Sequence, residues 1–220
     1  RMLRAEAGAV EELLGRGDLD AARDRLSSLC GRDARDLDAS GVAAAAIESV
    51  AENSVDAVVA PVFWASILGG PGALGYRAIN TMDAMVGHRS GRYERFGRCA
   101  ARLDDAANLA PARLTAALVA LVRPRRAAAV ARCVREDAPA HPSPSAGVAE
   151  AAFAGALDVE LGGTLRYGPR TEDRPRLGRG PRPRPRDIRR ATRLASHLDA
   201  ALIALLVLPT LAALRRRSAR

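Results

Sequence analysis

The sequence has 220 residues, of which 48% are apolar and only 3% aromatic, and it carries a formal net charge of +9. This length and apolar content exclude disorder throughout and allow a sizeable core, which Ala, Leu and Val must build by close helix packing. We therefore expect an all-α fold. All 34 basic residues are arginine, which excludes pyridoxal-phosphate and Walker-A enzymes because both need a lysine.

The first 40 residues are charged and are expected to form a helical connector. Two glycines separate two short amphipathic helices, predicted over 5–14 and 18–29. Asp18 can cap the second of them. The chain opens at Arg1 without the pattern of a signal peptide, and we expect an upstream part to precede it.

A core helical region is predicted over 41–165. Helices are expected over 41–68, 73–88, 93–122, 127–135 and 148–157. The first should stop at the GGPG motif that starts at Gly69, and the third should bend at Pro111. The three cysteines of the chain are widely spaced, which argues against a disulfide framework and a zinc site.

The C-terminal quarter is the source of the excess positive charge, with 15 arginines against 4 acidic residues in 166–220. Gly-Gly, Gly-Pro and Arg-Pro steps predict an irregular loop over 162–186, whose Arg/Pro-rich part is 166–186. An apolar helix over 187–220 should follow, capped by Asp187.

Membrane insertion remains open for this last helix, because its apolar run of about 15 residues is shorter than the roughly 20 that span a bilayer. The arginines that follow the run nevertheless fit a cytoplasmic flank. The alternative is a buried terminal helix. The same two possibilities apply to 55–76 and 106–122.

Three carboxylates form the first candidate site. Glu48, Glu52 and Asp56 are spaced i, i+4 and i+8, so a helix places them on one face. Like charges at this spacing repel, and a divalent cation, a phosphate-bound Mg²⁺ or facing arginines would offset them. The alternatives are a solvated face or a capping box formed by Ser49 and Glu52.

A second constellation follows in RLDDAANLAPAR, at 102–113. Asp104 and Asn108 share a helix face, and Arg102 lies one turn before Asp105. Arg113 follows the proline. Carboxylates beside arginines are typical of a Mg²⁺–phosphate site, although internal ion pairing is an equal alternative.

Asn80 and Asp83, spaced i and i+3, provide a third polar position in an apolar neighbourhood. Three such positions in one half of the chain favour a site. The three histidines are scattered and suggest no nucleophilic triad, so we interpret them as surface or structural residues.

The same segments resemble a known family over most of residues 41–195. The matching runs are ESVAENSVDAVVAPVFW at 48–64, GGPGALGYRAINTMDAMVGH at 69–88, YERFGRCAARLDDAANLAPARLTA at 93–116 and SPSAGVAEAAFAGALDVELGG at 143–163. They closely resemble the adenosylcobinamide-phosphate synthases, the CobD/CbiB family of cobalamin biosynthesis. His88 stands where the family usually has Tyr, and Ser145 where it usually has Asn.

The resemblance implies a multi-pass helical protein of the inner membrane, and we expect this sequence to be an N-terminally truncated copy. It implies an enzyme that joins adenosylcobyric acid to (R)-1-amino-2-propanol or its phosphate through an amide, with ATP and Mg²⁺ as cofactors. Membrane lipid and other membrane enzymes of cobalamin assembly are implied partners, whereas nucleic acid is not.

The resemblance also suggests roles for the polar residues, because amide formation requires activation of the carboxylate beside ATP and Mg²⁺. The acidic residues would supply metal and amine contacts, with Asp104 and Asp105 as metal ligands. Arg102 and Arg113 would hold phosphate or propionate. Asn53, Asn80 and Asn108 would orient the ligands. The complete expected site comprises Glu48, Glu52, Asn53, Asp56, Asn80, Asp83, Arg102, Asp104, Asp105, Asn108 and Arg113.

Two other classes of function are considered. A Mg²⁺-dependent membrane prenyltransferase would use Asp104-Asp-x-x-Asn108 to bind a diphosphate, but few aromatics are present to line an isoprenoid pocket. A non-enzymatic basic binding protein would use the Arg/Pro tail. That tail lacks interleaved aromatics, which favours a cytoplasmic loop.

Overall fold

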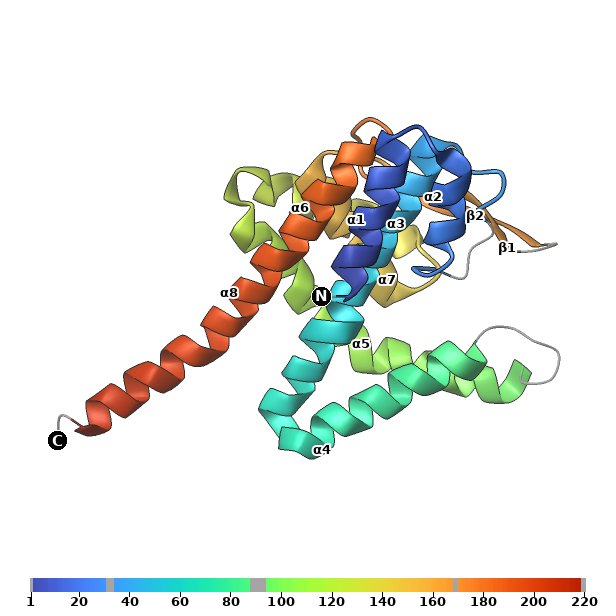
Figure 1. Cartoon of the computed structure of the whole chain (residues 1–220). Coiled ribbons are helices and arrows are strands. Elements are labelled where there is room, and N and C mark those ends of the chain that lie inside the picture. The colour runs from blue at the N-terminus through green and yellow to red at the C-terminus, as the bar shows by residue number, and fades with distance from the viewer. Residues whose placement is uncertain (1, 31–33, 88–93, 168–169, 219–220) are drawn as a thin grey trace.

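The protein is a helical bundle with one small β-hairpin (Figure 1), and the computed structural model describes residues 2–30, 34–87, 94–167 and 170–218. Its α-helices are α1 (Met2–Gly15), α2 (Leu19–Leu26), α3 (Ala39–Ser54), α4 (Ala60–Met82), α5 (Glu94–Val122), α6 (Ala127–Glu136), α7 (Pro144–Leu157) and α8 (Pro185–Ser218). Shorter helical turns are η1 (Val55–Val59), η2 (Asp83–Gly87), η3 (Pro124–Arg126) and η4 (Ala138–Ala140). Strands β1 (Leu161–Tyr167) and β2 (Arg170–Leu177) pair antiparallel.

The core surrounds α3 and α7, whose small side chains let neighbouring helices approach closely. Every residue from Gly147 to Leu157 on α7 is buried, as a helix that is apolar all round requires. α7 packs on α3, α5 and α6, and α1 and α8 pack on α3. The two short helices predicted over 5–14 and 18–29 form as α1 and α2. Asp18 caps α2 by accepting a hydrogen bond from the backbone N–H of Ala21 at 3.1 Å.

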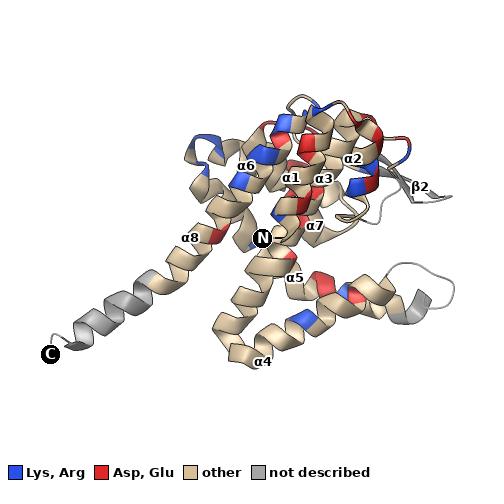
Figure 2. Cartoon of the chain, in the orientation of Figure 1, with Lys and Arg blue, Asp and Glu red and all other residues tan. Residues whose placement is uncertain are grey.

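Helices α4 and α5 form an arm that leaves this core (Figure 1). α3 continues through the π-helical turn η1 into α4, and α5 leads back from the arm to α7. Figure 2 shows few charged residues along the arm, and large apolar side chains such as Ile67, Leu74 and Leu121 are exposed. Among the described residues, Ala39–Gly87 and Gly97–Val122 are long and apolar enough to cross a membrane, judged by length and composition alone.

The predicted helix break at Gly69 is confirmed. This residue has φ 66° and ψ −155°, so α4 is two helical pieces joined at a kink. Only glycine adopts such a backbone conformation without strain. The kink turns the second piece of α4 alongside α5, which positions the polar residues of both helices against each other.

Gly69→Ala should therefore lower the stability of the protein by about 1–3 kcal/mol, because a Cβ strains this conformation. Gly70→Ala is the matched control, since a Cβ at that position meets no atom within 4 Å and the backbone φ of Gly70 is not positive. Thermal unfolding in detergent measures both. Equal melting temperatures for the two variants would contradict the role of the kink.

The prediction of an irregular loop over 162–186 is wrong for the first part of this segment, because β1 and β2 form a hairpin there. The chain is therefore mainly helical but not all-α. Both strands are edges of a two-stranded sheet, where Pro175 removes no required hydrogen bond. Gly162 has φ 84° where the register shifts and two residues of β2, Pro175 and Arg176, lie opposite this one residue of β1. The Gly and Pro residues that predicted a loop are thus accommodated by a strand edge and a bulge.

The predicted terminal helix forms, beginning two residues earlier than expected. Asp187 lies inside the first turn of α8, and its carboxylate accepts a hydrogen bond from the backbone N–H of Arg184 at 2.8 Å. It therefore caps the helix from within rather than from before it. Ile188, Leu194 and Leu198 are fully buried, so the first part of α8 belongs to the core.

Candidate functional site

Four polar side chains and one tyrosine meet where the arm joins the core. Asp56 lies on the π-helical turn η1, a feature often found at functional sites. Tyr76 and Asn80 lie one turn apart on α4, and Asp104 and Asn108 lie one turn apart on α5. We call these five residues the carboxyl–amide network.

Two asparagines bridge the two aspartates of the network. Asn80 Nδ2 donates to Asp56 Oδ2 at 3.2 Å and to Asp104 Oδ1 at 3.3 Å. Asn108 Nδ2 donates to Asp56 Oδ1 at 3.2 Å and to Asp104 Oδ2 at 3.0 Å. The Tyr76 hydroxyl lies 3.2 Å from Asp56 Oδ1 and 3.0 Å from Asn108 Oδ1. All four carboxylate oxygens therefore accept hydrogen bonds from neutral groups.

No guanidinium neutralises these aspartates within the described part of the chain. Arg77, the nearest basic contact, donates to Asn80 Oδ1 at 3.1 Å and to the Asp56 carbonyl oxygen at 3.4 Å. Asp104 is only 8% exposed, and Asn108 is fully buried. Two half-buried or buried carboxylates held together without a cation repel each other, which makes the pair suited to a positively charged ligand.

The donor set fits Mg²⁺ shared with a phosphate. Among the described residues, no group of three or more His, Cys, Asp or Glu side chains is arranged to hold a metal ion alone. Mg²⁺ in nucleotide sites, however, usually takes one or two carboxylates and completes its shell with phosphate and water. Asp56 and Asp104 would supply those carboxylates, and the amide oxygens of the asparagines are hard donors beside them.

An apolar cavity of about 380 Å³ adjoins the network between α4 and α5, lined among others by Trp64, Tyr76, Ile79 and Leu103. The indole Nε1 of Trp64 donates to the carbonyl oxygen of Ala107 at 3.0 Å, which fixes the ring across the two helices. Tyr76 belongs to both the cavity and the network. An apolar part of a ligand would therefore lie next to the paired carboxylates.

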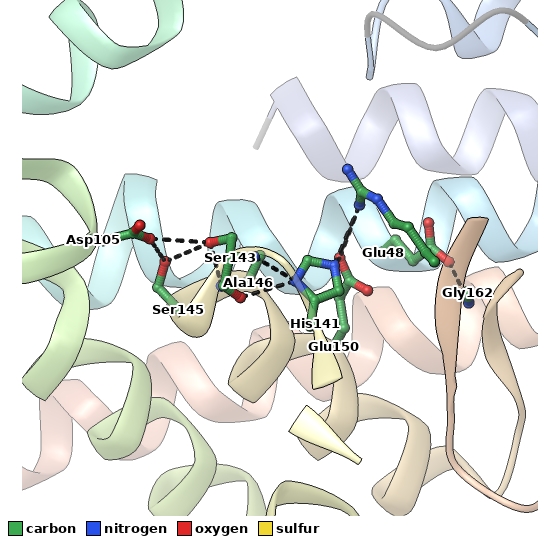
Figure 3. Close-up of polar contacts among 9 residues, drawn as sticks. Glu48, Asp105, His141, Ser143, Ser145, Ala146, Glu150 and Gly162 are labelled. Atoms are coloured by element: carbon green, nitrogen blue, oxygen red, sulfur yellow. Dashed lines mark hydrogen bonds and ion pairs between the residues drawn. The ribbon is translucent and has the colours of Figure 1, made fainter. Parts of the chain in front are cut away.

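A second cluster of ionisable side chains lies deeper in the core, where α3, α7 and β2 meet (Figure 3). It comprises Glu48, Glu52, His141, Glu150 and Arg174, and we call it the glutamate cluster. Glu48 accepts a hydrogen bond from the backbone N–H of Gly162 at 2.8 Å. Glu150 Oε1 lies 3.8 Å from His141 Nε2 and 3.9 Å from Arg174 Nη1.

Burial dominates the titration of this cluster. It raises the pKa of Glu150 well above its usual value, and the charges of Glu48 and Glu52 raise that pKa further. Burial also lowers the pKa of His141, against an opposing hydrogen bond with the backbone of Ser143. Burial therefore favours the neutral forms of both Glu150 and His141.

A short chain of polar contacts connects α5 to this cluster (Figure 3). The Ser143 and Ser145 hydroxyls lie 3.2 and 3.5 Å from Asp105 Oδ1. His141 Nδ1 lies 2.9 Å from the Ser143 carbonyl oxygen, and its Nε2 lies 3.4 Å from Arg174 Nη1. Asp105 thus turns toward α7, while its neighbour Asp104 joins the network.

The predicted site residues consequently separate into groups. Asp56, Asn80, Asp104 and Asn108 come together as expected, but the predicted carboxylate stripe is divided, because Glu48 contacts β1 whereas Asp56 contacts α4 and α5. Glu52 lies beside Glu150 in the glutamate cluster.

The remaining predicted residues lie outside both groups. Asn53 Nδ2 donates to the carbonyl oxygen of Ser49 on its own helix at 2.9 Å, and Arg113 Nη1 donates to Leu109 in the same way at 2.7 Å. Arg102 is exposed, and Asp83 lies on η2, one turn beyond the network. His88 lies outside the described residues.

Sequence reasoning missed Tyr76, Glu150, Arg174 and the buried position of His141. For two of these residues, Tyr76 and Glu150, the sequence contains a pattern that could have identified them. Tyr76 lies four residues before Asn80, on the same helix face. Glu150 is a single acid within an otherwise apolar helix. Arg174 lies in a segment predicted as a loop, so nothing local indicated its contacts.

Comparisons with known proteins agree with these motifs. The family model described as CobD/Cbib protein matches residues 1–195. Cobalamin biosynthesis protein CobD of Mycobacterium tuberculosis (strain CDC 1551 / Oshkosh) is 52% identical over 202 residues, which cover 90% of this chain and 64% of that protein. Proteins of the same name are 51% identical in Rhodobacter capsulatus (88% of this chain, 62% of the relative) and 50% identical in Chromobacterium violaceum (89% and 62%).

The chain spans less than two thirds of the length of these curated relatives. No solved structure matches it. Because the family model covers most of its residues, the chain belongs to the CobD/CbiB family.

Proposed function

We propose that the protein attaches (R)-1-amino-2-propanol, or its phosphate, to a propionate carboxyl of adenosylcobyric acid, giving adenosylcobinamide or its phosphate. The observation that carries this proposal is the pair Asp56 and Asp104, bridged by two asparagines beside an apolar cavity. Membership of a family whose curated members are named for cobalamin biosynthesis supports it, and argues against a prenyltransferase or a basic binding protein.

Amide formation from a carboxylate needs activation. Transfer of the γ-phosphoryl group of ATP to a propionate oxygen would give an acyl phosphate and ADP. The neutral amine would then attack the acyl carbon, and phosphate would leave with the proton that the amine nitrogen loses. When bound, Mg²⁺ would neutralise charge on the phosphate oxygens. Asp56 and Asp104 would hold it, while Asn80 and Asn108 keep both carboxylates oriented.

The other predicted residues have positions consistent with ligand contacts. Arg102 is exposed on α5 near Asp104, so its guanidinium is free of burial and can reach a phosphate or propionate. Arg113 is exposed about three turns further along the same helix. The apolar arm would place the site at a membrane surface, which supports an integral protein of the inner membrane.

An amide-formation assay tests the function. The complete protein in detergent is expected to convert adenosylcobyric acid and the amine to the amide only when ATP and Mg²⁺ are present, with the product identified by mass spectrometry. The free and the phosphorylated amine are compared in parallel. Absence of product with both amines would overturn the proposal, and ATP-independent product would overturn the acyl-phosphate route.

A further inference from the structure

We propose that the glutamate cluster binds the primary ammonium group of the amine substrate between Glu48, Glu52 and Glu150. The identity of the amine rests on the proposed function. The residues, however, are distinct from the carboxyl–amide network, so the activation of the acid and the binding of the amine are assigned to two neighbouring places.

The first support is an unmet hydrogen-bonding group. Glu150 is fully buried, and no described residue donates a hydrogen bond to its carboxylate oxygens, because the neighbouring Glu52 carboxyl can share with it only a proton that one of the two groups carries. Its nearest cationic side chains, His141 and Arg174, lie 3.8 and 3.9 Å away, too far for hydrogen bonds. Buried polar groups in native proteins are nearly always satisfied, so this carboxyl indicates a missing donor.

The second support is the charge balance. Among the described residues, the carboxyl groups of Glu48, Glu52 and Glu150 lie with the guanidinium of Arg174 and with His141, whose pKa burial lowers. In the empty cluster, a proton on Glu150 reduces the excess negative charge. A monovalent cation can take the place of that proton without changing the net charge.

An ammonium group fits this position better than a metal ion. It has three N–H donors and no acceptor, matching three carboxyl groups, and it does not demand octahedral coordination. Among the described residues, no group of three or more His, Cys, Asp or Glu side chains, this cluster included, is arranged to hold a metal ion by itself. Glu52 is half-buried and Arg174 is 16% exposed at its side chain, so these two residues connect the buried Glu150 to the protein surface.

The hairpin holds one wall of the cluster in place. The backbone N–H of Gly162 donates to Glu48 at 2.8 Å, and Gly162 has φ 84°, a conformation that favours glycine. A Cβ on Gly162 would overlap the carbonyl oxygen of Pro175. Glycine opposite the bulge therefore allows the hairpin to approach closely enough to hold the Glu48 carboxylate in place.

The glutamate cluster also provides an acceptor for the proton that the ammonium group must lose before amide formation. The amine reacts only as the neutral R–NH₂, so bound R–NH₃⁺ must give one proton to a carboxylate before its lone pair attacks. Glu52 or Glu150 accepts this proton and becomes neutral, so charge and atoms balance. Binding of the ammonium itself should displace the proton of the free cluster, and we expect proton release when the amine binds near pH 7.

The test measures binding of 1-amino-2-propanol to the complete protein in detergent by calorimetry, in two buffers of different ionisation enthalpy. Wild type should bind the amine and release protons, whereas 1,2-propanediol, which lacks the ammonium, should not bind. Glu150→Gln and Glu52→Gln should each weaken binding by about tenfold or more. Glu150→Gln should also abolish proton release. The matched control is Glu160→Gln, which removes only an ion pair with Arg176 at the start of the hairpin.

Kinetics separate this site from the proposed function. In the amide assay, both glutamine variants should raise KM for the amine at least about tenfold and leave KM for adenosylcobyric acid unchanged. Unchanged amine affinity in folded variants overturns the site. If Glu150→Gln does not fold, unchanged affinity in Glu52→Gln together with no proton release in wild type overturns it. Amine binding as described without amide formation would refute the proposed function instead.

Discussion

Asp104→Asn should reduce turnover by about 10²-fold or more, because removing one carboxylate charge weakens the hold on metal-bound phosphate where charge develops in the transition state. Raising the Mg²⁺ concentration should recover part of the loss. Folding should survive, since the substituted amide keeps the volume and one acceptor for Asn80 or Asn108. The lost repulsion with Asp56 also offsets a weakened hydrogen bond, so the change in stability should stay within about 1 kcal/mol.

Melting temperature and Mg²⁺-dependent turnover of the complete protein check this prediction. Asp20→Asn is the matched control, because that aspartate is exposed and pairs only with Arg23 on its own helix. Near-normal turnover per folded Asp104→Asn molecule would remove Asp104 from the proposed metal site. A large fall in melting temperature with normal turnover would assign it a purely structural role.

Asn108→Leu is expected to have the largest effect on stability. Asn108 is fully buried, donates to Asp56 and Asp104, and accepts from Tyr76. Leucine has a similar volume but leaves three buried polar groups short of a partner, which costs about 3 kcal/mol or more. For a chain of this length, the melting temperature should fall by roughly 6–12 °C, and activity should fall because both carboxylates lose their orientation.

Thr115→Val provides the comparison for this variant. Thr115 is also fully buried on α5, but its hydroxyl donates only to the Pro111 carbonyl oxygen of the same helix at 2.9 Å. Its replacement should change the melting temperature by only about 2–4 °C, equivalent to roughly 1 kcal/mol. Equal melting temperatures for the two variants would mean that the network does not hold α4 and α5 against η1.

Local patterns predicted most of the helical elements. Apolar periodicity located the helices, the glycine and proline motif at Gly69 located the kink, and Asp18 identified a helix cap. The hairpin escaped prediction, because its strands are held by their mutual register and by the contact between Gly162 and Glu48, 114 positions apart in the sequence. Contacts over such separations leave no periodic signal.

The grouping of the site residues likewise separates what local spacing predicts from what long-range contacts decide. Helical spacing correctly placed Asp104 with Asn108 and put Glu48, Glu52 and Asp56 on one face. It did not indicate that opposite ends of this stripe contact different helices, because periodicity defines a face and not its neighbours. Glu150 and Arg174 became relevant only when α7 and β2 packed beside α3.

By itself, the sequence determined the mainly helical class and the family, and it singled out Asp56, Asn80, Asp104 and Asn108 as candidates, since each inference depends on local composition, spacing and motifs. Tertiary structure alone decided that Asn80 and Asn108 join Asp56 to Asp104, and that Glu150 is buried beside Glu52 with no donor among the described residues. The physical reason is that pairing and burial depend on which helix faces meet. That choice is made by the whole core at once, where the hydrophobic effect outweighs any single local preference.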